Sequence, residues 1–127
     1  MLNWLFGKKT SEVQLSHLGI DIHSHILPGI DDGVSTLEES VQMAQKMQDL
    51  GYQQIITTPH IMWDCYRNTP DIIRGKLQEV QQASQAAGLT IQIGAAAEYF
   101  IDEHFLEMLD TDQEFLTLPG NRLLVEL

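Results

Sequence analysis

Histidine and carboxylate side chains recur at the ends of the apolar runs of this sequence, where they could bind metal ions. His23 and His25 lie two residues apart, and the other candidate residues lie after, or at the end of, later apolar runs. The set consists of His23, His25, Asp31, Asp32, His60, Glu98 and Glu126. Imidazole and carboxylate groups without thiolates suit Mn²⁺, Fe²⁺ or Zn²⁺. These residues therefore predict a divalent-metal site.

The spacing and number of these residues indicate more than one metal ion. Side chains alternate along an extended strand, so the rings of His23 and His25 point to the same face. Two histidines, two glutamates and an aspartate exceed the needs of one tetrahedral ion. Neighbouring metals can activate a water and stabilise an in-line displacement at phosphorus, which predicts hydrolysis of a phosphoester.

Each candidate ligand also has a purely structural interpretation. His60 follows a proline and could cap a strand, and Asp31 and Asp32 could serve only the turn before Gly33. Glu98, however, follows three alanines, and a carboxylate in such an apolar context needs a partner. Glu126 lies between Val and Leu and is interpreted in the same way. The two other histidines, His17 and His104, fall outside the pattern and are expected to be solvated or packed.

Alternating apolar and amphipathic runs predict a series of βα units. Strands are expected over about 19–23, 54–58, 90–97 and 123–127, a smaller one over 115–117, and helices over about 35–50, 70–87 and 103–109. Ser35 and Glu38 are predicted to form the capping box of the first helix, and Thr69 and Pro70 to begin the second. The strands should be parallel, so their carboxyl ends and the candidate ligands should face one end of the molecule.

Composition excludes several classes of function. The 127 residues suit one domain, and 18 acidic against seven basic residues give a net charge of −11. Such a charge argues against nucleic acid or an anionic membrane as the main partner. No apolar run is long enough to span a membrane. The single cysteine, Cys65, fits a reducing cytoplasm. It is a poor candidate for a phosphatase nucleophile, because cysteine phosphatases carry a phosphate-binding arginine six residues after the cysteine and this chain has Asp71 there.

Five short motifs together resemble the PHP-domain phosphatases, and most closely the bacterial manganese-dependent protein-tyrosine phosphatases of capsule and exopolysaccharide clusters. The motifs are Asp21-Ile22-His23-Ser24-His25, Pro28-Gly29-x-Asp31-Asp32-Gly33, Thr57-Thr58-Pro59-His60, Ala97-Glu98-Tyr99 and Leu124-Val125-Glu126. The resemblance covers residues 18–127, and residues 1–17 are expected to form an N-terminal tail.

The resemblance implies a fold, a site and a reaction. The fold is α/β, a PHP-type distorted (β/α)7 TIM-like barrel, of which this chain would hold about the first four βα units. The implied ligands of two or three metal ions, with Mn²⁺ expected first, are His23, His25, Asp32, His60, Glu98 and Glu126. Asp21 would orient a ligand histidine. The implied reaction is hydrolysis of phosphotyrosine on a bacterial tyrosine kinase that controls capsule synthesis.

Members of that family are longer than this chain. Their further ligands, another histidine and a later Asp-x-His, and an arginine for the substrate phosphate correspond to positions after Leu127. The chain is therefore expected to be the N-terminal portion of the domain and to be incompetent as an enzyme by itself. Arg67, in the loop after His60, could contact a phosphate, or it could be a solvated loop residue.

Two other functions stay open at this point. One is a PHP phosphatase of a small phosphoester such as histidinol phosphate, because the motifs define the metal chemistry better than the substrate. The other is a truncated, non-catalytic module that binds the kinase or assembles with itself.

Overall fold

A computed structural model describes residues 15–127 of the chain. Most of the predicted tail, residues 1–14, lies outside the described residues, and residues 16–18 form a turn that leads into the first strand. Among the described residues, none of the helices has the length and apolar character needed to cross a bilayer.

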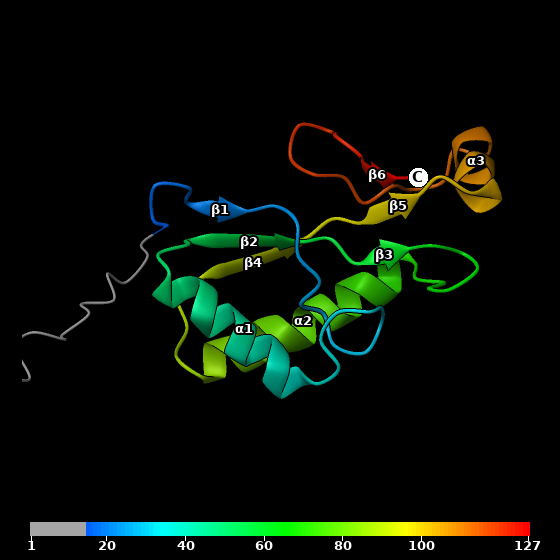
Figure 1. Cartoon of the computed structure of the whole chain (residues 1–127). Coiled ribbons are helices and arrows are strands. Elements are labelled where there is room, and N and C mark those ends of the chain that lie inside the picture. Colours follow the sequence, from blue (N-terminus) through cyan, green and yellow to red (C-terminus); the bar gives the residue numbers. More distant parts are fainter. Residues whose placement is uncertain (1–14) are drawn as a thin grey trace, which may run out of the picture.

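The described residues form two small parallel sheets with three helices. The helices are α1 (Leu37–Asp49), α2 (Pro70–Ala86) and α3 (Glu103–Asp110), and the strands are β1 (Ile20–Asp21), β2 (Gln54–Thr57), β3 (His60–Ile61), β4 (Gln92–Ala95), β5 (Glu98–Phe100) and β6 (Leu124–Glu126). One sheet has the order β1-β2-β4 and the other β3-β5-β6 (Figure 1). All four strand pairs are parallel, as predicted.

Two segments of the chain each pass from the first sheet into the second. β2 continues into β3 across Thr58 and Pro59, and β4 continues into β5 across Ala96 and Ala97. Pro59 has no N–H to donate to a ladder. The N–H of Thr58 donates to the Ser24 carbonyl at 2.7 Å, and that of Ala97 donates to the Leu116 carbonyl at 3.2 Å. The regular pairing is therefore interrupted at this junction, which we call the seam, although the N–H of Ala96 still donates to the Thr57 carbonyl at 2.9 Å and that of Glu98 to the Pro59 carbonyl at 3.0 Å.

The seam corrects one prediction. A single strand over 90–97 that ends beside Glu98 is wrong, because β4 stops at Ala95 and Glu98 opens β5 instead. His60 likewise opens β3 rather than closing β2. Both residues consequently lie at the start of the second sheet, next to the carboxyl ends of the first.

Helices α1 and α2 lie side by side on one face of the β1-β2-β4 sheet (Figure 1). Ala44 of α1 and Ile73 and Val80 of α2 are fully buried there, against Ile55 of β2. The predicted cap of α2 is confirmed, since Thr69 accepts the N–H of Ile72 and Pro70 is the first helical residue.

The predicted start of α1 is wrong by one residue. Thr36, in an extended conformation, is the N-cap, and it forms the capping box with Glu39 rather than Ser35 with Glu38. The Glu39 carboxylate accepts the N–H groups of both Ser35 and Thr36, at 2.7 and 3.2 Å. This double contact explains why a helix capped by Thr36 is more stable than one capped by Ser35.

Residues 115–117 do not form a strand, so that prediction is also wrong. They are held by tertiary contacts instead. Phe115 meets Tyr99 and Phe105 edge-on, and the N–H of Leu116 donates to the Tyr99 hydroxyl at 2.8 Å. Burial raises the pKa of Tyr99, so its hydroxyl stays neutral.

Tyr99→Phe should destabilise the fold by about 1 kcal/mol, because it removes the only side-chain acceptor of the Leu116 N–H among the described residues. Urea unfolding monitored by circular dichroism measures this difference. Tyr52→Phe is the matched control, since the Tyr52 hydroxyl makes no hydrogen bond within residues 15–127. Equal stability of the Tyr99 variant and the wild type would contradict the role given to this hydroxyl.

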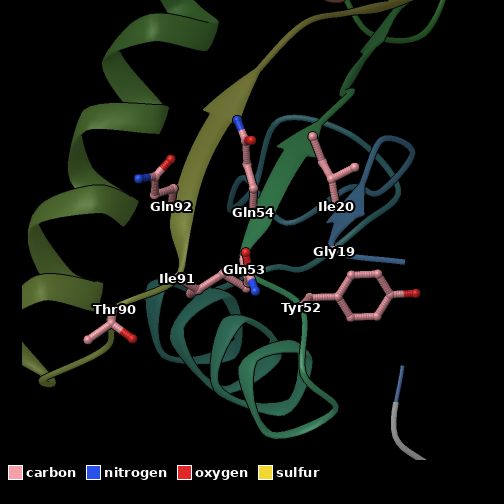
Figure 2. Close-up of a pocket in the computed structure, with 8 residues that line it drawn as sticks. All are labelled: Gly19, Ile20, Tyr52, Gln53, Gln54, Thr90, Ile91 and Gln92. Atoms are coloured by element: carbon pink, nitrogen blue, oxygen red, sulfur yellow. The ribbon is translucent and has the colours of Figure 1, made fainter. Parts of the chain in front are cut away.

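A hollow of about 500 Å³ opens at the amino ends of β1, β2 and β4 (Figure 2). Its lining contains no histidine, carboxylate or basic side chain; the lining residues are Gly19, Ile20, Tyr52, Gln53, Gln54, Thr90, Ile91 and Gln92. The residues capable of metal or acid–base chemistry lie at the opposite end of these strands.

Candidate metal centre

The predicted ligands come together at the seam from four parts of the chain. His23 and His25 follow β1, and Asp32 lies in the same β1–α1 connection. The other three come from the second sheet: His60 opens β3, Glu98 opens β5 and Glu126 closes β6. Since β5 pairs with both β3 and β6, the strands that carry these three residues are adjacent.

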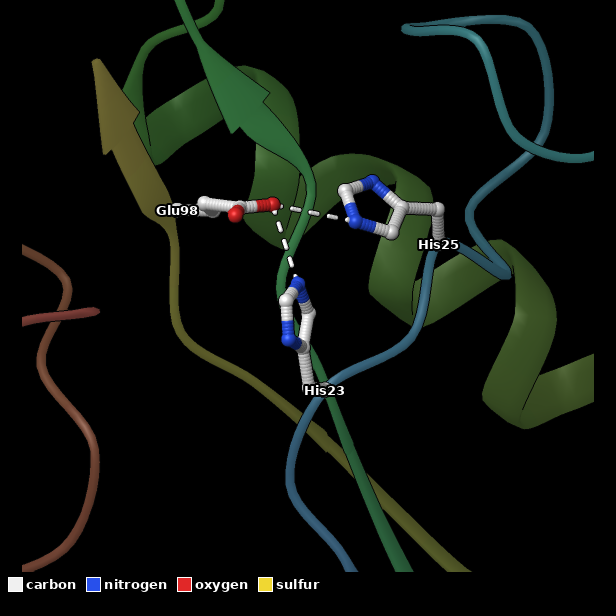
Figure 3. A group of neighbouring side chains, drawn as sticks. All are labelled: His23, His25 and Glu98. Atoms are coloured by element: carbon white, nitrogen blue, oxygen red, sulfur yellow. Dashed lines mark hydrogen bonds and ion pairs between the residues drawn. The ribbon is translucent and has the colours of Figure 1, made fainter. Parts of the chain in front are cut away.

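Glu98 is the centre of the cluster. Its Oε2 lies 3.1 Å from Nε2 of His23 and 3.1 Å from Nε2 of His25 (Figure 3). The same oxygen is 3.5 Å from Nδ1 of His60. Only 8% of the Glu98 side chain is exposed, so a single buried carboxylate faces three imidazoles.

His60 connects Glu98 to two further carboxylates. Its Nδ1 is 3.1 Å from Oε1 of Glu126, and its Nε2 is 3.3 Å from Oδ1 of Asp32. The rings of His25 and His60 are 4.5 Å apart. Although Nδ1 of His60 is buried and two carboxylates lie near it, neither of them accepts a hydrogen bond from it with acceptable geometry. A metal ion between these atoms would satisfy the nitrogen and both oxygens.

Ligand atoms of the cluster form three overlapping groups in which all atoms lie within 4.8 Å of one another. The groups are His23, His25 and Glu98; His25, Asp32 and His60; and His60, Glu98 and Glu126. All six predicted ligands are thus brought together, although their role as ligands stays a prediction. His25, His60 and Glu98 each belong to two groups, which is the arrangement expected for neighbouring ions that share a small set of ligands.

The electrostatics of the cluster also fit a cation. Four carboxylates, those of Asp31, Asp32, Glu98 and Glu126, converge on three imidazoles. Within residues 15–127, no lysine or arginine forms an ion pair with any of the four. Buried carboxylates need a compensating positive charge, and divalent ions would provide it.

Asp31 and Asp32 are neighbours in sequence with different surroundings. The Asp31 side chain is fully buried and Asp32 is 62% exposed. Oδ2 of Asp31 accepts Nδ1–H of His25 at 2.9 Å and the backbone N–H of His60 at 3.0 Å, and its Oδ1 accepts the N–H of Gly33 at 2.9 Å. Asp31 belongs to none of the three groups of candidate ligand atoms.

The two residues predicted to act on the reaction are not part of the cluster. Oδ2 of Asp21 is buried without a hydrogen-bond partner among the described residues, so this oxygen makes no contact to a ligand histidine. Arg67 is exposed; its Nε donates to the Trp63 carbonyl at 2.8 Å, and its guanidinium lies 5.4 Å from the centre of the Trp63 ring. The roles proposed for Asp21 and Arg67 stay predictions.

Tyr66 is a neighbour of the cluster for which no role was predicted. Its ring stacks on His60 with centroids 5.7 Å apart and 17° between the planes. Desolvation, followed by the charge of Asp32, raises the pKa of Tyr66 and keeps the phenol neutral. Tyr66 is held by a tight turn, in which Met62 and Tyr66 exchange backbone hydrogen bonds. The spacing of residues in the sequence does not predict such a turn.

The two remaining histidines lie outside the cluster, as predicted. His17 is exposed, and His104 stacks on Trp63 at 3.7 Å.

Gly33→Ala should lower the stability of the fold by about 1–3 kcal/mol and weaken Mn²⁺ binding at least about tenfold. A Cβ at Gly33 would overlap the His25 carbonyl oxygen and lie 2.6 Å from His25 Cβ, so the loop that holds His25 must shift. Thermal unfolding in EDTA and calorimetric titration with Mn²⁺ measure the two effects.

Gly75→Ala is the control for that variant. Gly75 lies within α2, and a Cβ there meets nothing within 4 Å, so alanine should stabilise the helix by about 0.5–1 kcal/mol without affecting Mn²⁺. If both glycine variants bound Mn²⁺ like the wild type, Gly33 would have no role in shaping the site.

Comparison with known proteins relates this geometry to a family. Residues 19–127 match the family profile described as "Capsular polysaccharide synthesis, CpsB/CapC". The putative tyrosine-protein phosphatase CapC of Staphylococcus aureus is 28% identical over 88 residues, which are 69% of this chain and 34% of that protein. The tyrosine-protein phosphatase CpsB of Streptococcus agalactiae is 32% identical over 94 residues, which are 74% of this chain and 39% of CpsB.

A solved structure shares the fold. It comes from work on YwqE of Bacillus subtilis and CpsB of Streptococcus pneumoniae, described as metal-dependent tyrosine phosphatases. The match has a TM-score of 0.72 and 29% identity, and it covers 84% of this chain and 43% of that one. The mixed α/β architecture with parallel sheets is therefore that of these proteins, and this chain spans less than half the length of the relatives that it matches.

Proposed function

Because this chain belongs to the CpsB/CapC family of capsular polysaccharide synthesis, we propose that it supplies part of the active site of a metal-dependent protein-tyrosine phosphatase. The observation that carries the proposal is the buried Glu98 carboxylate, which faces His23, His25 and His60 within 3.5 Å. Since the chain covers only 34–43% of the length of these relatives, the activity is proposed for the complete family domain.

The proposed cofactor is Mn²⁺, and Fe²⁺ or Zn²⁺ would fit the same donors. The six ligands proposed for two or three ions are His23, His25, Asp32, His60, Glu98 and Glu126. Bound divalent ions would polarise a phosphoryl oxygen and make a water acidic enough to be nucleophilic at neutral pH. The sheet supports the donor positions, because three of the six ligands, His60, Glu98 and Glu126, stand on the adjacent paired strands β3, β5 and β6.

We also propose that the two small sheets are the beginning of a PHP-type distorted (β/α)7 barrel. Four extended segments, each parallel to its neighbour, would supply the strands, and the candidate ligands lie beyond the carboxyl ends of β1, β2 and β4 and at the carboxyl end of β6. That arrangement is the one in which (β/α) barrels build active sites.

The proposed substrate is phosphotyrosine on a bacterial tyrosine kinase of capsule synthesis, in the cytoplasm. Several relatives are named tyrosine-protein phosphatases, which supports this substrate over a small phosphoester. Arg67 is exposed in the loop after His60, and we propose that it contacts the substrate phosphate. We also propose that Asp21 supports a ligand histidine.

The test compares two substrates with the complete product of the reading frame that encodes this chain, loaded with Mn²⁺. A phosphotyrosine peptide should be hydrolysed and histidinol phosphate should not. Turnover of histidinol phosphate alone would replace the proposed substrate. Absence of bound metal by elemental analysis, in a folded protein that still captured the kinase, would favour the non-catalytic binding module.

A further inference from the structure

We propose that Asp31 is a positioning residue, which holds His25 with its proton on Nδ1 and its Nε2 free to meet a metal ion. This inference rests on the proposed metal centre but goes beyond its list of ligands. Among the described residues, the hydrogen-bond partners of the Asp31 carboxylate are all N–H groups, one from an imidazole and two from the backbone.

The proton position on His25 follows from geometry and chemistry. Among the described residues, only Nδ1 of the two His25 ring nitrogens has a carboxylate contact with hydrogen-bond geometry, at 2.9 Å from Oδ2 of Asp31. An ionised carboxylate can only accept hydrogen bonds, so Nδ1 carries the hydrogen. In a neutral ring Nε2 then has a free lone pair, and this lone pair is on the side of Glu98 Oε2, 3.1 Å away. Two lone pairs at that distance repel each other unless a cation lies between them.

Asp31 also ties together two segments that are far apart in sequence. The oxygen that accepts from His25 also accepts the backbone N–H of His60, and the other oxygen accepts the N–H of Gly33. One buried carboxylate thus fixes the ring of one candidate ligand and the backbone of another. The Asp31 side chain is shielded from water, so its charge-assisted hydrogen bonds to the His25 ring and the His60 N–H are strong.

Asp32 provides the contrast that makes the inference specific. It is largely exposed, its Oδ1 lies 3.3 Å from Nε2 of His60, and it makes no contact with His25 Nδ1. Loss of Asp32 should remove a ligand, whereas loss of Asp31 should release the orientation of His25.

The experiment uses the metal-free chain and its variants, with ¹⁵N-labelled histidine rings, in mildly alkaline buffer where imidazole is neutral. Ring nitrogen shifts should show His25 of the wild type with its proton on Nδ1. Asp31→Ala should move the proton mainly to Nε2, as in free histidine. Asp31→Asn should keep it on Nδ1, because the amide oxygen can still accept it. Asp32→Ala should leave the His25 proton on Nδ1.

Titration with Mn²⁺ alone supplies a second readout. Asp31→Ala should weaken binding about 10–100-fold, and Asp31→Asn should recover most of that loss. If the wild type itself carries the His25 proton on Nε2, the proposal is overturned whether or not the alanine variant folds. Loss of the Nδ1 proton in Asp31→Asn would overturn it as well. Absence of Mn²⁺ binding by the complete product of the reading frame would instead overturn the proposed function, while the ring shifts would still decide the role of Asp31.

Discussion

Glu98→Gln should weaken Mn²⁺ binding more than about 100-fold while leaving the metal-free fold intact. Glu98 belongs to two of the three groups of candidate ligand atoms, and its Oε2 lies 3.1 Å from a ring nitrogen of both His23 and His25. Loss of a residue that only supports a ligand costs about 10–100-fold in affinity, so loss of a shared ligand should exceed that range. Glutamine keeps the volume of the side chain and fills the same buried space.

The measurement is calorimetric titration with Mn²⁺, combined with thermal unfolding in EDTA to check the fold. Glu107→Gln makes the same chemical change on the exposed face of α3, and it should bind Mn²⁺ like the wild type. Equal affinity of Glu98→Gln and Glu107→Gln would mean that Glu98 is a buried structural carboxylate rather than a ligand.

Local sequence rules predicted the elements whose signals lie within one turn of the chain. The start of α2 is one such case, because a Thr cap followed by Pro allows only one register. The start of α1 is the opposite case, because the same five residues allow two capping boxes. One pairs Ser35 with Glu38, and the other pairs Thr36 with Glu39. Contacts of Glu39 with two backbone N–H groups decide between them.

The seam could not be predicted from hydrophobic periodicity. Residues 90–97 alternate and resemble one strand, but β4 ends at Ala95, beside Pro59 of the neighbouring segment, which has no N–H to donate, and the N–H of Ala97 donates to Leu116, a residue nineteen positions later. The same bond helps to hold residues 115–117, which do not pair as a strand. Bonds that join distant segments leave no local signature in the sequence.

The candidate site was predictable to the extent that it depends on residue type and strand position. Six side chains expected to converge do meet, but at the seam, since His60 and Glu98 open β3 and β5 instead of closing the strands before them. The different positions of Asp31 and Asp32 were not predictable, because both follow the same turn and either could point inward. Burial of Asp31 is set by its contacts with His25 and His60, which become neighbours only in the folded chain.

Metal binding should itself stabilise the chain. A ligand that binds only the folded state at about 100 times its dissociation constant adds about 2.7 kcal/mol, which for a chain of this size raises the unfolding temperature by roughly 10 °C. The folded cluster concentrates four carboxylates without a lysine or arginine partner within residues 15–127, whereas the unfolded chain disperses them. The cation therefore removes a repulsion that exists only in the folded state.

Differential scanning calorimetry with Mn²⁺, with EDTA, and with KCl at matched ionic strength tests this expectation. Because the whole chain carries a net charge of −11, salt alone should stabilise it somewhat by screening, and K⁺ measures that part. Mn²⁺ should exceed K⁺ by several degrees, EDTA should reverse the gain, and Glu98→Gln should respond to both ions alike. If K⁺ reproduced the entire effect of Mn²⁺ on the wild type, the stabilisation would come from general screening, and the imidazoles of His23, His25 and His60 would not be holding an ion.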